Sequence, residues 1–144
     1  MGMDLISKSG SRFDLSAAWW SFYLTLAEKC GWTPKGTGKP DHLGEKDEWH
    51  GAYDSNDGQV VDEEDARALA EALERALVDP AAGAIIERML DAWWEDMLQA
   101  EAELSGVSEQ QKKMLRAVMA RPKFDIEFTR ELIDLCNHGE FRIE

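Results

Sequence analysis

The side chains best suited to acid–base chemistry or metal binding gather between residues 41 and 65. His42 and His50 lie in or beside an irregular stretch that is rich in carboxylates. An imidazole next to a carboxylate can act as a general base, so an enzyme that uses His42 or His50 is one hypothesis. Neither these residues nor His138 belongs to an HExxH zinc motif or a Glu-x-x-His diiron pair. Solvated histidines are the simpler interpretation, and we expect no catalytic residue and no bound metal.

Residues 54–64 match part of a calcium-binding EF-hand loop, which needs oxygen ligands at fixed positions and a glycine at its sixth position. With Gly58 in that place, Asp57 and Glu64 fall at ligand positions. Tyr53 then falls at the first position, where a carboxylate is required. A hairpin turn that leads into a capped helix explains the same residues without a metal.

A glycine-rich segment at residues 36–39, Gly-Thr-Gly-Lys, invites comparison with the phosphate-binding loop. That loop needs a glycine five residues before its Gly-Lys pair and a Ser or Thr after it. Thr33 and Pro40 occupy those positions instead. We therefore reject a phosphate loop and expect no cofactor.

Aromatic side chains flank residues 31–48, the longest irregular stretch of the sequence. Together, Trp32, Trp49, His50 and Tyr53 could form the wall of a pocket. This arrangement would predict a small-molecule or metal-binding module centred on residues 31–58. Trp32 and Trp49 could instead pin the loop to the core, and we favour that interpretation.

The formal net charge is −13, and the negative charge is concentrated in the middle of the chain. Residues 49–106 carry 15 acidic and three basic side chains, whereas the segments on either side are nearly balanced. Such a field repels phosphate backbones and anionic lipids and attracts basic partners, so we expect no nucleic-acid or membrane binding. The basic side chains after this region are interpreted as a solvated helix face. They are Lys112, Lys113, Arg116, Arg121 and Lys123.

Glu87, Asp91 and Glu95 form a row of like charges spaced four residues apart. Such a row destabilises a helix slightly, so it is either a solvated face or a docking face. The leading hypothesis is a non-enzymatic interaction protein that binds a basic protein partner through the acidic region 62–103, with this row as the partner-binding residues. Small acidic bacterial proteins with regulatory or toxin-neutralising (immunity) functions offer an analogy, because charge gives them fast association.

A few further features of the sequence predict the cellular location and the oligomeric state of the protein. Cys30 and Cys136 lie outside any CxxC pair, and each ends an apolar helical pattern, which predicts buried reduced thiols. The first residues lack the pattern of a secretory signal, and the longest apolar stretch, 17–27, is too short to span a bilayer. We expect a cytoplasmic protein. Helix faces at Trp19 or Trp94 could pair two copies in a homodimer.

Hydrophobic periodicity predicts an α+β fold, a helix-rich single domain over residues 1–144 with about five helices, two short β-hairpins and a short C-terminal strand. The Trp-rich segment 16–30 is apolar around most of its circumference, as a central core helix would be. The Asp-Gly turn at 57–58 predicts a second hairpin between 49–53 and 59–61. The other expected elements are a first hairpin at 3–7 and 11–15, helices at about 62–79, 82–104, 108–120 and 125–137, and a strand at 141–143.

Several segments in the first half of the sequence are distinctive. They are MGMDLIS at the start, Cys30-Gly31-Trp32-Thr33-Pro34, Trp49-x-Gly51-x-Tyr53, Ser55-Asn56-Asp57-Gly58-Gln59-Val60-Val61 and Glu64-Asp65-Ala66. On these segments, residues 1–78 resemble a family of small uncharacterised bacterial proteins with no known activity. The resemblance implies that the region around residues 31–66 is a recurring unit, and it implies no catalytic residue.

Overall fold

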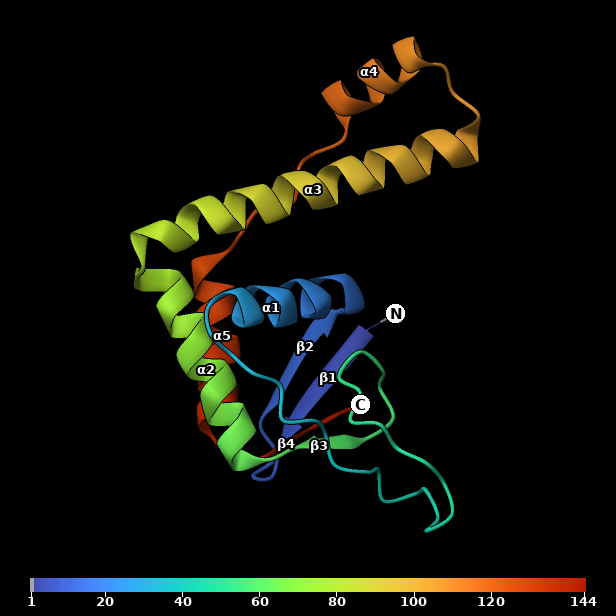
Figure 1. Ribbon diagram of the computed structural model, residues 1–144. Helices are drawn as coiled ribbons and strands as arrows, with labels where there is room; N and C mark the ends of the chain where they lie inside the picture. The colour runs from blue at the N-terminus through green and yellow to red at the C-terminus, as the bar shows by residue number, and fades with distance from the viewer. Residues whose placement is uncertain (1) are drawn as a thin grey trace.

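Four short strands form one antiparallel sheet in the order β2-β1-β4-β3 in the computed structural model, which describes residues 2–144 (Figure 1). Burial alternates along the first strand, where Met3, Leu5 and Ser7 are buried and the residues between them are partly exposed. The sheet therefore buries one of its faces. The strands are β1 (Gly2–Ser7), β2 (Arg12–Ser16), β3 (Gln59–Val61) and β4 (Phe141–Ile143).

Five helices complete the α+β fold, as the hydrophobic periodicity predicts. They are α1 (Ala17–Lys29), α2 (Glu63–Val78), α3 (Pro80–Ser105), α4 (Glu109–Val118) and α5 (Ile126–Asn137). Each begins at a residue whose side chain accepts a hydrogen bond from a backbone N–H of the first turn. These caps are Ser16, Asp62, Asp79, Ser108 and Asp125. Helix α3 begins two residues earlier than expected, because Asp79 caps it and proline suits its first position.

The core lies between the sheet and helices α1, α2 and α5. Helix α1 contributes the fully buried Trp20 and Tyr23, in line with its expected central position. Leu73 of α2, Leu132 of α5 and Phe141 of β4 are buried in the same apolar cluster. The segments that build this core come from both halves of the sequence, so the body of the molecule depends on long-range packing.

The expected second hairpin does not form, because β3 pairs with β4 and residues 49–53 contain no strand. A hydrogen bond from the side chain of Gln59 holds the loop that precedes β3. The side chain of Gln59 is buried, and its amide nitrogen donates to the backbone oxygen of Ser55 at 2.6 Å. On the other side of β3, Gly38 forms a single bridge to Val60. The loop thus places Gly38, rather than residues 49–53, beside β3.

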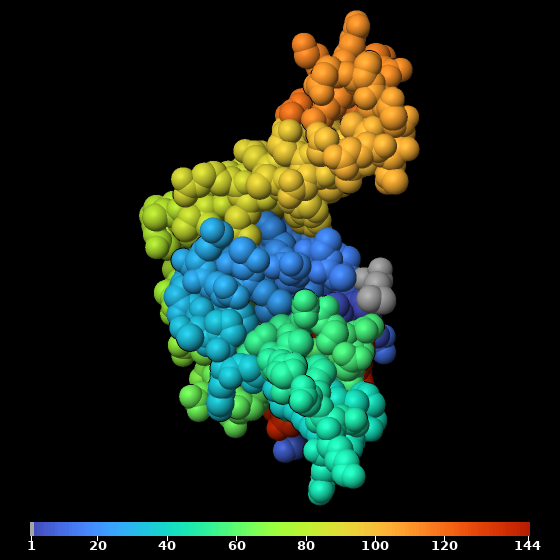
Figure 2. All heavy atoms as spheres, turned by 45° about the vertical axis from the view of Figure 1, so that its right-hand side comes forward, coloured from blue at the N-terminus to red at the C-terminus, as the bar shows by residue number. Residues whose placement is uncertain are grey.

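Helix α3 continues past the body of the molecule, and α4 folds back along it as a projecting hairpin (Figures 1 and 2). Gly106 makes the turn with a φ of 62°, a left-handed conformation that favours glycine. Leu98 and Ala102 of α3 are buried outside the main core, whereas α4 itself has no buried residue. Few apolar contacts therefore hold α4 in place.

Two further expectations concern thiols and membranes. Cys136 is buried and Cys30 is partly buried, and both are free thiols. Burial raises the pKa of the Cys136 thiol above its ordinary value. Within residues 2–144, none of the helices combines the length and apolar character that a bilayer crossing requires.

A buried hydrogen bond joins α1 to the start of α5. The hydroxyl oxygen of Tyr23 lies 2.9 Å from Oγ1 of Thr129. Thr129 donates its single hydroxyl proton to the backbone oxygen of Asp125 at 2.8 Å, so Tyr23 is the donor in the pair. Burial raises the pKa of Tyr23 to about 12, which keeps the proton in place at neutral pH.

Replacing Tyr23 with Phe tests this bond. At neutral pH we expect Tyr23→Phe to lower the free energy of unfolding by about 1 kcal/mol, the usual net value of such a bond. The folded pKa of about 12 lies above the ordinary 10.0, so the wild-type advantage is complete below pH 10 and shrinks between pH 10 and 12. Urea unfolding of both proteins near neutral pH and again at about pH 11 measures the effect. A difference that does not change with pH would contradict the assignment.

Candidate functional site

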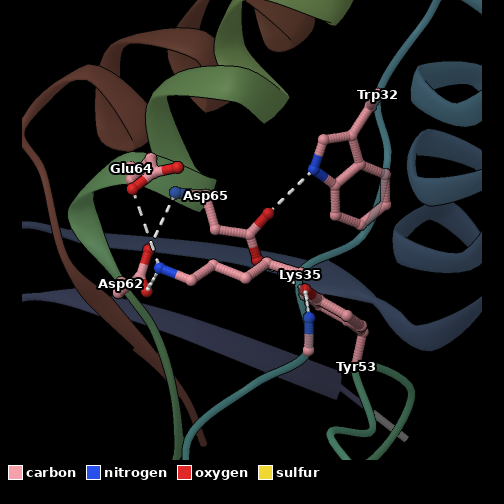
Figure 3. A network of polar contacts seen from close by, with 7 residues as sticks. Trp32, Lys35, Tyr53, Asp62, Glu64 and Asp65 are labelled. Carbon is pink, nitrogen blue, oxygen red and sulfur yellow. Dashed lines mark hydrogen bonds and ion pairs between the residues drawn. The ribbon is translucent and has the colours of Figure 1, made fainter.

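A buried carboxylate at the start of α2 ties the long loop, residues 31–58, to the core (Figure 3). Asp65 is 2% exposed, and its Oδ1 accepts a hydrogen bond from Nε1 of Trp32 at 2.9 Å. Its Oδ2 accepts a hydrogen bond from the hydroxyl of Tyr53. The backbone N–H of Asp65 donates to Oδ1 of Asp62, the cap of α2, at 2.8 Å. Side chains from both ends of the loop thus meet on one carboxylate.

Tyr53 is the most connected residue of this network. Its ring packs edge-on against Trp32, with ring centres 5.2 Å apart. Its hydroxyl accepts a hydrogen bond from the backbone of Gly36 at 2.8 Å, and its backbone oxygen accepts one from Nε1 of Trp20 at 2.7 Å. Burial and the hydrogen bond to Asp65 raise the pKa of Tyr53 above its ordinary value. Tyr53 therefore stays protonated and remains a donor.

Lys35 closes the network at the surface, beside an open groove of about 680 Å³. Its Nζ lies 2.5 Å from Oδ2 of Asp62 and 3.8 Å from Oε2 of Glu64. The hydrogen bond from Lys35 lowers the pKa of Asp62 and raises that of Lys35 itself. At the centre of the network, both oxygens of Asp65 already have partners within the chain. The arrangement suits attachment of the loop.

The four residues predicted to form a pocket wall have different contacts in the structure. Trp32 and Tyr53 do meet, but inside the network just described. Trp49 lies elsewhere in the loop, where its Nε1 donates to the backbone oxygen of Thr37 at 3.1 Å. The side chain of His50 is 84% exposed. Trp32 ties the loop to α2 through Asp65, whereas the hydrogen bond of Trp49 joins two parts of the loop itself.

The histidines occupy exposed positions. His42 is exposed in the loop, and Nε2 of His50 lies 3.5 Å from Oε2 of Glu48. His138 follows the end of α5, and its Nδ1 lies 2.6 Å from the backbone oxygen of Asp134. In the part of the chain that the structure describes, no three His, Cys, Asp or Glu side chains are grouped to hold a metal ion.

The predicted acidic row lies on α3, and it holds arginines from the same chain. Nη2 of Arg121 lies 2.6 Å from Oε2 of Glu87, and its Nη1 lies 2.7 Å from Oδ1 of Asp91. Arg116 of α4 forms an ion pair with Glu95. The two carboxylates beside Arg121 raise its pKa. The row is thus part of the contact between α3 and the segment that returns along it.

The expectation of a solvated basic face at residues 112–123 is therefore wrong for Arg121, whereas Arg116 is exposed but also forms an ion pair. The guanidinium carbon of Arg116 also lies 5.1 Å from the centre of the Trp94 ring. Two sequence signals could have indicated this pairing. The acidic row has a regular four-residue spacing, and Gly106 ends the helix that carries it, so that the basic segment can return along α3.

Sequence reasoning missed a groove between α2 and α5. Its volume is about 700 Å³, and Val78 and Ile126 are exposed beside it. Val78 is the last residue of α2 and Ile126 the first of α5. Apolar residues at two helix ends are the signal that could have found it.

Comparisons with known proteins assign no family to the chain. No protein-family model, curated protein or solved structure matches it. The interpretation of these sites therefore depends on their own geometry.

Removing either side-chain donor to Asp65 tests the attachment of the loop. We expect Trp32→Phe and Tyr53→Phe each to lower the free energy of unfolding by about 1–3 kcal/mol, because each leaves a buried carboxylate oxygen without its donor. Urea unfolding measures the loss, and trypsin cleavage at Lys46 should become faster in both variants. His50→Ala, an exposed position in the same loop, is the control and should change stability by less than about 0.5 kcal/mol. Equal stability of all the proteins would contradict the attachment.

Proposed function

We propose that this chain is a non-enzymatic interaction protein that binds a basic protein partner through its acidic region 62–103. One observation supports the proposal most. Helix α3 carries six carboxylates and one cation, and three of these carboxylates already bind guanidinium groups. The spacing of the row therefore fits arginine side chains, and the chain's own arginines occupy the place that a partner's would take.

In the proposed complex, cations of the partner replace Arg116 and Arg121 on the row. Exposed ion pairs typically contribute about 0–1 kcal/mol each, so the exchange is energetically easy. The side chains of Glu87 and Asp91 are 61% and 63% exposed, which leaves them accessible from solvent. Displaced arginines return to water.

The acidity of α3 continues beyond the row. Asp96, Glu101 and Glu103 form no ion pair with any residue between 2 and 144. Their uncompensated field extends over a screening length of about 8 Å at physiological salt. Such a field steers a basic protein during encounter and raises its association rate. We assign steering to these three carboxylates and specific binding to the row.

On this proposal the protein is a regulatory or toxin-neutralising protein of the bacterial cytoplasm. The free thiols of Cys30 and Cys136 suit a reducing compartment. A small-molecule module centred on residues 31–58 has less support. The side-chain donors of Trp32 and Tyr53 already bind Asp65, so they are not available to a ligand. An enzyme that uses His42 or His50 has the least support, since both are exposed.

The test is capture of proteins from a lysate of the source cells by the immobilised chain, at about 0.05 M and about 0.5 M salt, between which the screening length falls severalfold. We expect a basic protein to be retained at low salt and released at high salt. The variant E87K/D91K should fail to retain it. The variant R121Q should retain it more tightly, because the row then loses an internal competitor.

A matched control separates the effect of net charge from the effect of changing the acidic row. The variant E45K/E48K makes the same change in net charge at exposed positions of the loop, and it should capture the partner as the wild type does. Three results would refute the proposal. They are the absence of any captured basic protein, retention that salt does not affect, and undiminished capture by E87K/D91K.

A further inference from the structure

The two borders of the sheet differ in whether another part of the chain covers them. The strand order puts β2 at one border and β3 at the other (Figure 1). On β3, the backbone N–H of Gly38 donates to the oxygen of Val60 at 2.7 Å and accepts the reverse bond at 3.2 Å. Among residues 2–144, β2 pairs with β1 and with no other strand. An uncovered strand edge attracts extended chains, so β2 is the border where another molecule can add.

Backbone hydrogen bonds show which residues of β1 bond to which neighbour. The N–H of Ser7 donates to the oxygen of Ser11 at 2.8 Å, on the side of β2. Asp4 exchanges two backbone hydrogen bonds of 2.7 Å with Glu144, on the side of β4. Because these bonds alternate along an antiparallel strand, the odd-numbered residues of β1 bond to β2 and the even-numbered residues bond to β4.

The same alternation identifies the free backbone groups of β2. Leu5 lies opposite Phe13, so the backbone of Phe13 bonds to β1. Arg12 and Asp14, on either side of Phe13, therefore direct their N–H and C=O groups away from β1. In the part of the chain that the structure describes, these backbone groups have no hydrogen-bond partner. The open edge thus offers two donors and two acceptors.

The side chains of the open edge carry one cation and one anion, two residues apart. Arg12 and Asp14 have 55% and 59% of their side-chain surface exposed, whereas Phe13 between them is buried. Nε of Arg12 lies 2.7 Å from Oδ1 of Asp14, and its Nη2 lies 2.8 Å from Oδ2 of Asp4. Asp4 is the residue opposite Asp14 on β1. Two carboxylates therefore share one guanidinium, and Asp14 can accept a second.

We propose that β2 pairs with β2 of a second copy of this chain, antiparallel and with the two-fold axis at Phe13. Arg12 then lies opposite Asp14 of the partner subunit, and Asp14 lies opposite Arg12 of the partner subunit. The two N–H and two C=O groups of each strand form four hydrogen bonds between the copies. The two four-stranded sheets become one continuous sheet.

Charge selects both the occupant and the register. Along β2 the order is cation, Phe13, anion, and an antiparallel second copy presents the reverse order. Each charge therefore meets its opposite, and opposite charges directly across a strand pair are stabilising. Moving the axis by one residue sets Asp14 against its own copy or Arg12 against its own copy, which is destabilising. A second copy in this one register is thus complementary to the edge.

The helix faces that the sequence analysis suggested for a homodimer already have contacts within the chain. The ring of Trp19 packs edge-on against Trp93, with ring centres 4.9 Å apart. The ring of Trp94 lies beneath the guanidinium of Arg116 at 5.1 Å. We therefore place the contact between copies on the sheet.

The size of the contact makes the association weak. Stable dimers bury about 800 Å² on each partner, and a five-residue strand covers less than that. Each copy also has a net charge of −13, and the two copies repel each other at long range. At about 0.15 M salt this repulsion is screened beyond about 8 Å, whereas the pairs at the edge lie closer than that. Association is therefore best measured at high protein concentration and physiological salt.

Sedimentation equilibrium of the full chain, at up to about 0.5 mM protein in about 0.15 M salt, tests the proposal. We expect the wild type to associate reversibly. R12D and D14R should each raise the dissociation constant by about tenfold or more, because each sets two pairs of like charges opposite each other. The double variant R12D/D14R restores opposite charges and should associate as the wild type does. An equimolar mixture of R12D and D14R should associate as well, for the same reason.

A second pair of variants tests the backbone hydrogen bonds. D14N and D14P both remove the charge, but only D14P also removes the N–H that points away from β1. Proline is tolerated on an edge strand where the N–H faces solvent. We expect D14P to dissociate more readily than D14N, by about fivefold or more, since each copy loses a donor to the other.

Matched controls separate the edge from net charge. K46D and E45R, at exposed positions of the loop, change the net charge as R12D and D14R do and should associate as the wild type does. Circular dichroism of each variant verifies that it folds. A chain that stays monomeric throughout, association that neither R12D nor D14R weakens, or a double variant as weak as the single ones would overturn the proposal.

This inference does not rest on the proposed function, because β2 lies outside the acidic region 62–103. Partner capture that depends on Glu87 and Asp91 would stand even if the chain proved monomeric, so the two proposals fail separately.

Discussion

A carboxylate buried away from water is stable only where donors surround it, and Asp65 imposes that constraint on the whole fold. Its position in the first turn of α2 is favourable, because the helix dipole stabilises a negative charge there. It still needs Trp32 and Tyr53 within hydrogen-bond distance. Those two residues fix both ends of the long loop, and the loop in turn delivers β3 to the sheet. The path of the loop, and with it the placement of β3 at the edge of the sheet, thus depends on one side chain.

The helices could be predicted from the sequence because the information that starts and stops them is local. Ser16, Asp62 and Ser108 each stand just before an apolar helical pattern, and each is observed as a cap. The partner of β3 could not be found in the same way. A hairpin with residues 49–53 satisfies every local rule, and only a strand more than 70 residues away displaces it. The burial of Asp65 could not be predicted from the sequence either, because its neighbours Glu63 and Glu64 are also acidic but remain exposed.

The charged residues also show that a sequence gives their positions along the chain but not their partners in space. The sequence locates the acidic row and the basic segment, but it does not state that Arg121, which follows α4, bridges Glu87 and Asp91 of α3. Polar contacts, the ion pair Arg116–Glu95 and the hydrogen bond from Lys112 to Gln99, join α4 to α3, and α4 itself buries no residue. The contact of α4 with α3 is therefore exposed to screening by salt, while the core around Tyr23 and Leu132 is held by apolar packing.

The central position of β4 has a consequence for how the chain folds during synthesis. Leu5 of β1 pairs with Ile143, and β4 is also the strand that pairs with β3, so the sheet is divided until residues 141–143 arrive. A nascent chain that has emerged as far as α4 holds three strands with open edges and lacks the helix that packs most closely on α2. Open strand edges attract other extended chains. Until β4 arrives, the partly emerged chain exposes these edges, and its negative charge opposes contact with acidic neighbours.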